Sequence, residues 1–136
     1  YQDLQVIRAR GKGIIPSVAR VLLQFSKSFS ILHDTDTPQT AGGKANPAWG
    51  MNKTIEGILS WENANERVHL VACKPCFEVA LFGEEAKDEK PYNALVRIRT
   101  DKATKLRVKA LLDCLLDPKV GVPNGCIRWK TVDDLA

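Results

Sequence analysis

The sequence predicts an α/β fold in which a mostly parallel sheet is flanked by helices, and two observations favour this class. Short runs rich in branched apolar residues alternate with longer segments whose apolar residues recur at helical spacing. The composition, 44% hydrophobic and 26% charged, excludes the disordered and fibrous classes. A length of 136 residues suits one compact domain spanning residues 1–136.

Three short runs predict strands, at residues 4–9, 28–32 and 68–72. The first run ends at Gly11-Lys12-Gly13, where glycine interrupts the apolar pattern. The second ends in His33-Asp34-Thr35-Asp36-Thr37-Pro38, and Pro38 cannot continue a central strand because it lacks a backbone N–H. Both polar turns therefore follow directly on a predicted strand.

Apolar periodicity predicts helices at 17–25, 52–63, 75–82 and 104–116, and Pro118 stops the last of them. Pro16 lies in the first turn of the first helix. The expected apolar stripes are Val18, Val21, Leu22 and Phe25 in that helix, and Ile55, Ile58 and Leu59 in the second. Segments 39–49 and 83–90 are expected to be loops, and the tail from Val120 to be irregular with Trp129 docked on the body.

The charge balance and the chain start limit the possible partners. No apolar run approaches the ~18 residues that span a bilayer, and no signal peptide opens the chain, so we expect a cytoplasmic protein with no membrane partner. Lysine and arginine number 20 against 16 acidic residues, a mild basic excess that is compatible with a polyanionic partner without requiring one. The chain begins with Tyr1, and we expect it to be a piece of a longer polypeptide.

The four cysteines are interpreted as reduced structural thiols. Cys73 and Cys76 form a lone C-x-x-C motif, whereas Cys114 and Cys126 are too widely separated to supply the second pair of a zinc site. A redox motif would open a helix near the start of the fold, but this one follows a mid-chain strand. Zinc or redox chemistry remains the alternative.

Two motifs follow predicted strands and are expected to form one site, because ligands of parallel sheets bind at the carboxyl ends of strands. Asp34 and Asp36 would repel each other, and a divalent ion such as Mg²⁺ would offset that repulsion. Gly11 and Gly13 would let a phosphate approach the backbone, and Lys12 would add charge. The alternatives are a local D-x-D turn and a plain glycine connector.

Two further residues, Glu78 and Lys90, are candidates for the same site, and His33 beside it has a structural interpretation. Glu78 follows the third strand, so its carboxylate could face the same edge as Asp34, although it could also be a solvated residue at a helix start. His33 is expected to form hydrogen bonds at the strand end rather than to act as a ligand or base. Lys90 follows an acidic loop, and without further context it would be an ordinary exposed lysine.

The order of these motifs resembles the Toprim domain of the OLD-family (overcoming lysogenization defect) endonucleases over about residues 6–92. The matching pieces are Arg10-Gly-Lys-Gly13, His33-Asp-Thr-Asp-Thr-Pro38, Asn46-Pro-Ala-Trp49, Asn52, Phe77-Glu78 and Lys90-Pro-Tyr92. Each piece alone is common, and their order is the specific feature. The resemblance implies a Toprim-like, Rossmann-like fold and a metal-dependent DNA endonuclease or nickase.

The resemblance also implies roles for single residues. Asp34 and Asp36 match the metal-binding D-x-D, Glu78 a later acidic ligand, and Gly11 with Gly13 the glycine turn. Lys90 corresponds to a lysine that stabilises charge on the scissile phosphate, and Lys12 could do the same. The implied cofactor is Mg²⁺ or Mn²⁺, as one or two ions. ATP would enter only through a fused ABC-type ATPase that this chain lacks, and a homo-oligomer would form through that region.

One departure from the family pattern is important. Toprim domains carry a glutamate after their first strand, and the only acid before Asp34 here is Asp3, which precedes the predicted strand. We expect the first strand and its glutamate to lie N-terminal to Tyr1, which would leave this chain weak or inactive in cleavage by itself. The rival interpretation is a non-catalytic nucleic-acid-binding or regulatory module. A Toprim primase or topoisomerase is less favoured, because no catalytic tyrosine region or zinc module is visible.

Overall fold

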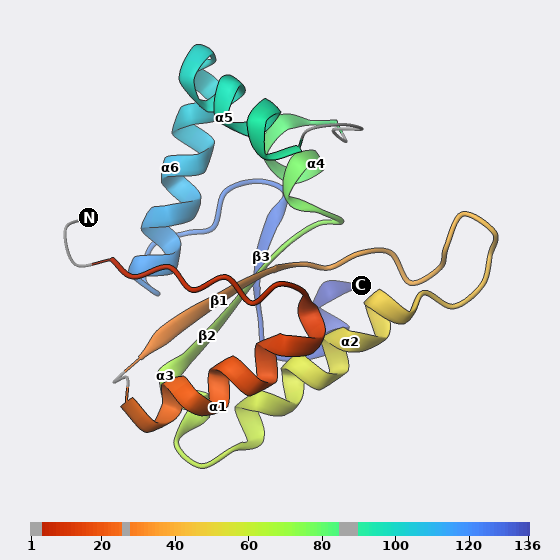
Figure 1. The fold of residues 1–136 in the computed structure, drawn as a ribbon, viewed down its shortest axis with the longest axis vertical. Helices are drawn as coiled ribbons and strands as arrows, with labels where there is room; N and C mark the ends of the chain where they lie inside the picture. Colours follow the sequence, from red (N-terminus) through yellow and green to blue (C-terminus); the bar gives the residue numbers. More distant parts are fainter. Residues whose placement is uncertain (1–3, 26–27, 85–89) are drawn as a thin grey trace.

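The computed structural model describes residues 4–25, 28–84 and 90–136, which fold into a three-stranded sheet covered by helices on both faces (Figure 1). The elements, in chain order, are η1 (Lys12–Ile14), α1 (Ile15–Phe25), β1 (Phe29–Asp34), α2 (Pro47–Glu56), η2 (Gly57–Ser60), α3 (Ala64–Arg67), β2 (Val68–Cys73), α4 (Phe77–Phe82), α5 (Lys90–Thr100), α6 (Lys102–Leu116), β3 (Cys126–Trp129) and η3 (Val132–Leu135). The α/β class is thereby confirmed.

The sheet has the order β1-β2-β3 and is mixed rather than mostly parallel. β1 and β2 are parallel, with Phe29 opposite Val68 and Asp34 opposite Cys73. β3 returns antiparallel to β2 and pairs Leu70 with Trp129. The polar sequence after β1 and the turn after β2 therefore lie together at one end of the sheet, where both parallel strands terminate.

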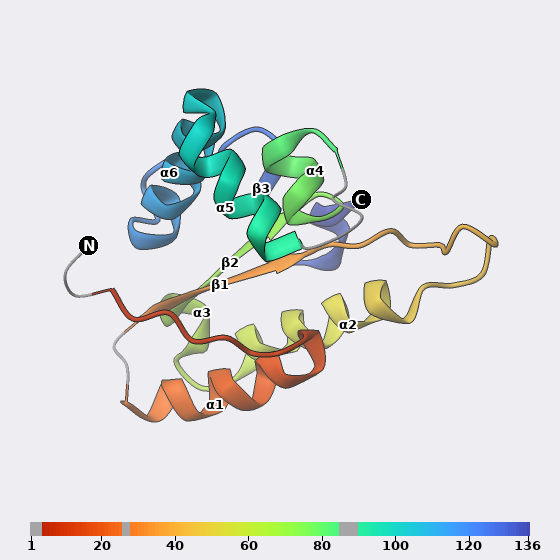
Figure 2. The same ribbon diagram turned by 45° about the horizontal axis from the view of Figure 1, so that its top comes forward.

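Two separate cores lie on the two faces of the sheet, and the central strand β2 contributes to both. Val68, Leu70 and Ala72 of β2 face a core that they share with α1, α2 and β1. Val71 and Cys73 point the other way, into a core formed with α4 and α6. Figure 2 shows this sandwich: α1, α2 and α3 lie on one side of the strands, and α4, α5 and α6 lie on the other.

The predicted strand at 4–9 is wrong. These residues form no ladder, and Val6 and Ile7 are 82% and 54% exposed. They run beside the outer edge of β1 (Figure 1), but a cleft separates them from that strand. The branched apolar residues of this segment predicted a strand, but a strand forms only when it pairs with a neighbouring strand. The cleft keeps this segment apart from β1, so the two do not pair. The other two strands are confirmed, and each is longer than predicted.

The helices at 17–25 and 104–116 are confirmed as α1 and α6, but the apolar stripe of α1 is wrong in part. Val21 and Phe25 are 58% and 85% exposed, whereas Ile15 and Ala19 are the buried residues of this helix. The helix is rotated so that small and branched residues of its first turns face the sheet, and its C-terminal end extends past the core.

The second helix begins five residues before the predicted start and ends at Glu56, short of the predicted end at residue 63, because a 3-10 turn (η2) follows. α2 starts at Pro47, because the side chain of Asn46 accepts a hydrogen bond from the Ala48 N–H (3.0 Å) and Pro47 suits a first helical turn. This start places Asn52 in the middle of the helix, fully buried. Ile55 and Ile58 are buried as predicted. The predicted short helix at 75–82 is present as α4, beginning at Phe77.

Three elements of the C-terminal half were not predicted: α5, and both β3 and η3 in the tail that was expected to be irregular. α5 was missed because its sequence is hydrophilic on average, and β3 was missed because a four-residue strand carries little pattern. The docking of Trp129 is confirmed, since it is 2% exposed in the first core. Gly125 allows the chain that enters β3 to pass close to α4. Its φ is +84°, and a Cβ there would lie 2.8 Å from the Ala80 backbone.

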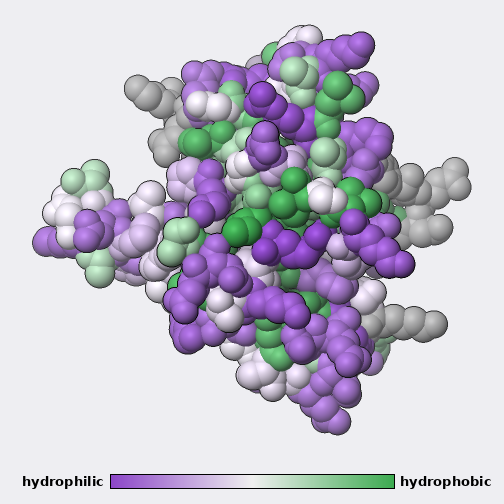
Figure 3. Space-filling view, turned by 180° about the vertical axis from the view of Figure 1, so that it is seen from behind, coloured by the Kyte–Doolittle hydropathy of each residue, from purple (hydrophilic) through white to green (hydrophobic). Residues whose placement is uncertain are grey.

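The segment between β1 and α2 projects from the body of the molecule. It is closed by an isolated bridge between Gln39 and Ala45. Figure 3 shows this projection at the left and, near the middle of a mostly hydrophilic face, a group of hydrophobic side chains. Within the described ranges, no helix has the combination of length and apolar character that crossing a membrane requires.

Candidate functional site

The candidate site lies where β1 ends, beside a cleft of about 930 Å³. One wall of the cleft is the segment 7–12, and the other is formed by β1 with Asp34 and Asp36 at its end. Among the described residues β1 pairs only with β2, so its outer backbone edge faces this cleft. The cleft floor is apolar, with Ile15, Ala19 and Leu22 of α1. The site therefore combines an apolar channel with charged groups at one end.

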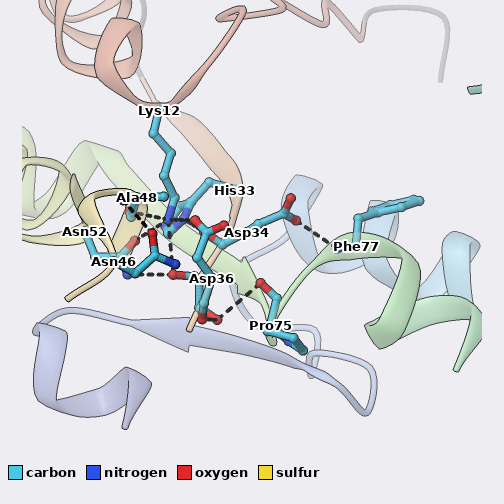
Figure 4. Close-up of polar contacts among 10 residues, drawn as sticks. Lys12, His33, Asp34, Asp36, Asn46, Ala48, Asn52, Pro75 and Phe77 are labelled. Atoms are coloured by element: carbon cyan, nitrogen blue, oxygen red, sulfur yellow. Dashed lines mark hydrogen bonds and ion pairs between the residues drawn. The ribbon is translucent and has the colours of Figure 1, made fainter. Parts of the chain in front are cut away.

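Lys12 reaches from η1 across to the end of β1, and its side chain is 10% exposed. Its Nζ donates to Asp36 Oδ2 (2.6 Å), Asn52 Oδ1 (2.8 Å) and the backbone oxygens of Thr35 and Ala48 (both 3.1 Å) (Figure 4). The glycine connector and the D-x-D turn thus meet in one site. The ammonium, however, is fully engaged with protein oxygens.

Asp36 owes its position to an unusual backbone conformation. Its φ is +60°, in the left-handed region that aspartate tolerates better than most residues. The Asp36 N–H donates to the Pro75 carbonyl (2.8 Å), and the Thr35 N–H donates to the Cys73 carbonyl (2.9 Å). These two bonds fasten the turn after β1 to the turn after β2 and direct the Asp36 carboxylate toward Lys12.

Asp34 belongs to the other face of the sheet. Its Oδ1 accepts a hydrogen bond from the Phe77 N–H at the start of α4 (2.8 Å), and Figure 4 shows its side chain pointing away from Lys12. Burial raises the pKa of this carboxyl, and the neighbouring carboxylates of Glu78 and Asp36 raise it further. The Phe77 bond and the Lys12 charge act in the opposite direction. Asp34 is therefore a half-buried carboxylate whose charge is only partly compensated.

The two aspartates do not form a pair of ligands on one side of the chain. In a continuous strand residues two apart would share a face, but the left-handed turn at Asp36 removes that relation. Asp36 contacts the α1–α2 layer through Lys12, whereas Asp34 contacts α4. Across residues 4–25, 28–84 and 90–136, no three acidic, histidine or cysteine side chains gather in a way that could hold a metal ion.

The remaining predicted site residues lie at different distances from this centre. Glu78 is in the first turn of α4, close enough for its charge to raise the pKa of Asp34. Gly11 has a φ of +123° and precedes η1, and Gly13 lies within η1. Both glycines have open space at the Cβ position, so the backbone there is accessible. Lys90 begins α5, but its side chain lies outside the described part of the chain.

His33 is buried beneath the site at 7% exposure, in the role expected of a strand-end residue. Its Nδ1 lies 2.8 Å from the Asp34 carbonyl, so Nδ1 carries the donated proton. Its ring packs edge-on against Trp129 at 5.3 Å between centroids. Burial lowers the pKa of His33 from 6.5 to about 4, so the ring is neutral near pH 7.

Sequence reasoning missed the structural importance of Asn52. It is fully buried, it donates from Nδ2 to the Thr35 carbonyl (2.9 Å), and it accepts from Lys12. A lone asparagine among the apolar residues of a predicted helix was the available signal, because buried amides need partners. The family resemblance included Asn52 in its motif order but assigned it no role.

The cysteines do not form a metal site with one another. All four are free thiols, and Cys73 and Cys114 are buried. The nearest thiol to Cys73 is Cys126 across the β2–β3 pair, with the sulfurs 3.6 Å apart, rather than its C-x-x-C neighbour Cys76. Burial and the contact with Cys126 raise the pKa of Cys73. These features agree with the interpretation as structural thiols.

In comparisons with known proteins, no family model, no curated protein and no solved structure matches this chain.

Proposed function

We propose that this chain is the metal-binding part of a Toprim-type nuclease, which hydrolyses phosphodiester bonds in DNA with the help of Mg²⁺ or Mn²⁺. Support from the sequence is the order of its motifs from Arg10 to Tyr92. Support from the structure is that the D-x-D segment and the segment leading to Phe77 follow the carboxyl ends of the two parallel strands, where α/β proteins bind ligands.

The observation that carries the proposal is the incomplete charge compensation at Asp34. This carboxylate is partly desolvated, and its pKa is raised both by burial and by the nearby charges of Glu78 and Asp36. A group in that state gains from a cation bound close to it on the α4 side of the sheet end, where Glu78 also lies. Carboxylate oxygens are hard donors of the kind that Mg²⁺ prefers. Asp34, with Glu78 as second ligand, therefore suits a divalent ion.

A bound divalent ion would supply Lewis acidity toward a phosphate oxygen and lower the pKa of a water molecule. Mg²⁺ often takes only one or two carboxylates and fills its other positions with water and substrate oxygens, which agrees with the small number of acidic side chains here. Lys12 contributes positive charge near the substrate position without a direct contact, since its protons are engaged. Gly11 and Gly13 leave the backbone open to a phosphate.

The cleft beside β1 offers a position for a further ligand. An extended segment could pair with the free outer edge of β1, in parallel with that strand. Such a segment would end beside Asp34, at the same end of the sheet. An acidic residue at the end of such a segment would complete the coordination.

The first experiment is a calorimetric titration of the chain with Mn²⁺. We expect Asp34→Asn to weaken binding by roughly ten-fold or more, because Asp34 is the central ligand. The matched control is Asp133→Asn, an exposed aspartate in η3, which should bind as the unaltered chain does. Equal Mn²⁺ affinity in the Asp34→Asn variant and the unaltered chain would refute the proposed site.

The second candidate function is a non-catalytic nucleic-acid-binding or regulatory module. The observation in its favour is that Lys12 already neutralises Asp36, which removes one of the two expected metal ligands. In that case DNA affinity should fall steeply with salt, be independent of Mg²⁺ and survive Asp34→Asn. A fluorescence-anisotropy titration with labelled duplex DNA, with and without Mg²⁺, distinguishes the two functions.

A further inference from the structure

The ammonium of Lys12 occupies a cage of oxygen atoms rather than a simple ion pair. Four oxygens lie within 3.1 Å of Nζ, from the Asp36 carboxylate, the Asn52 amide and the carbonyls of Thr35 and Ala48. An ammonium has three protons, so four acceptors exceed what a lysine needs. One carboxylate and three neutral oxygens carry a total charge of −1, which matches a single monovalent cation.

The walls of the cage are held by bonds in which Lys12 takes no part. Asn52 is fixed by burial and by its Nδ2 bond to the Thr35 carbonyl (2.9 Å). The Asp36 and Thr35 amides are bound to the turn after β2. Asn46 caps α2, whose first turn includes Ala48. The oxygens should therefore stay in place when the lysine is removed.

We propose that Lys12 is a tethered cation, whose ammonium fills an oxygen cage that would otherwise bind a free monovalent cation of similar size, such as K⁺. Protein carbonyl oxygens bind K⁺ in the same way when they replace its water shell. The tether makes the cation permanent. It neutralises Asp36 and joins η1, α2 and the end of β1 through one charged group.

A consequence follows for the divalent site, and this step rests on the proposed function. Because Asp36 is already neutralised from the α1–α2 side, only the Asp34 side of the sheet end keeps a carboxylate for Mg²⁺ or Mn²⁺. We therefore expect one divalent ion per chain rather than two. Lys12 acts here as a positioning residue, and its charge takes the place that a second ion would have.

The test of the cage compares two variants by thermal unfolding in KCl and in tetramethylammonium chloride at equal ionic strength. Lys12→Ala empties the cage, so KCl should raise its Tm by about 2–4 °C in a saturable manner relative to the bulky cation. Lys12→Met fills the same space with an uncharged chain, and it should show no K⁺ effect, like the unaltered protein. The same Tm for Lys12→Ala in both salts would overturn the proposal.

A second measurement applies if Lys12→Ala does not fold. In the unaltered chain, nitrogen-15 NMR of the lysine side chains should show one ammonium whose protons exchange slowly near neutral pH, and Lys12→Arg should remove that signal. Exchange that is equally fast for every lysine would refute the cage.

Mn²⁺ titration of the unaltered chain then tests the consequence separately. One bound ion agrees with a single divalent site, and two ions of similar affinity refute it. No bound ion contradicts the proposed function, while the K⁺ and NMR experiments still decide whether the cage exists.

Discussion

Asp34 and Asp36 are separated by one residue, yet their surroundings differ. Asp36 lies on the α1–α2 side, paired with the buried ammonium of Lys12 at 2.6 Å. Asp34 lies on the α4 side, where the Phe77 N–H donates a hydrogen bond to it, and burial together with the neighbouring carboxylates raises its pKa. One carboxylate contributes to the stability of the fold, whereas the other is held in an unfavourable electrostatic environment.

This difference indicates how the two residues divide their roles. A satisfied ion pair joins elements and resists change, whereas a partly desolvated carboxylate with acidic neighbours costs stability in the free protein. Such uncompensated groups occur at functional sites because a ligand provides the missing charge. Substitutions on the two sides of the sheet end should therefore have opposite effects on folding, which the first two of the four predictions below test.

The largest expected effect is that of Lys12→Met. It removes the cation from a buried network and leaves the Asp36 carboxylate and the Asn52 amide oxygen without their partner, so the free energy of unfolding should fall by about 3 kcal/mol. Urea denaturation measures the change. Lys53→Met is the matched control: Lys53 also pairs with a carboxylate, that of Glu56, but its side chain is 75% exposed. The control should lose less than about 0.5 kcal/mol, and equal losses would remove the distinction between a buried and an exposed pair.

The second prediction compares the two aspartates directly. Asp36→Asn leaves the Lys12 ammonium buried without an anion, and we expect a loss of about 2 kcal/mol in the free energy of unfolding. Asp34→Asn removes a carboxylate whose charged form is disfavoured, so its effect should be smaller and stabilising. Urea denaturation at pH 7 without divalent ions measures both. Equal losses of stability in the two variants would show that the two carboxylates do not differ in charge compensation.

The third prediction concerns pH and the first core. The pKa of His33 is lowered from 6.5 to about 4 by burial, so below pH 6.5 the unfolded chain takes up a proton that the folded chain does not. Stability should therefore fall with decreasing pH, by about 1.5 kcal/mol between pH 7 and about 5.3. His33→Gln should remove most of this loss in urea denaturation. The control His69→Gln should remove less, because His69 is less buried and burial is the main cause that lowers its pKa. An unchanged pH profile for His33→Gln would contradict the prediction.

The smallest expected effect is at the start of α2. Asn46→Ala removes the side-chain cap to the Ala48 N–H, and should lower the free energy of unfolding by about 1 kcal/mol. The carbonyl of Ala48 belongs to the Lys12 cage, so the cap should also help to hold the cage. Asn46→Ala should therefore lower the free energy of unfolding by less in a Lys12→Met background than in the unaltered chain. Fully additive losses in this double-mutant cycle would show that the cap and the cage are independent.

Helices and strands were predicted correctly where their pattern of apolar residues was long enough to recognise. α1, α6, β1 and β2 have repeated apolar residues over one or more turns or along a full strand, and all four were predicted with small errors at their ends. β3 is only four residues long, and the sequence of α5 is hydrophilic on average, so neither drew attention as an element of a core. The segment 4–9 had the pattern of a strand but lies apart from the sheet across the cleft.

The same limit applies to the site. The residue types after β1 indicated acidic chemistry at the end of a parallel strand, and the sequence also indicated that Gly11-Lys12-Gly13 would lie near it. A spacing of one residue between two aspartates did not reveal that they face opposite layers. That outcome depends on a left-handed backbone at Asp36, held by the Pro75 carbonyl from 39 positions further along the chain. No local pattern encodes such a contact.

The sequence by itself therefore determined the α/β class, the two parallel strands and the concentration of charged residues at their ends, because these follow from periodicity and from short-range breakers such as Pro38. Only the tertiary structure decided that Lys12 fills a cage formed by Asp36, Asn52 and two carbonyls, and that Asp34 is left with uncompensated charge. The physical reason is that hydrogen bonds and charges act through space, between groups that only the packing of distant segments brings within 3 Å or so of one another.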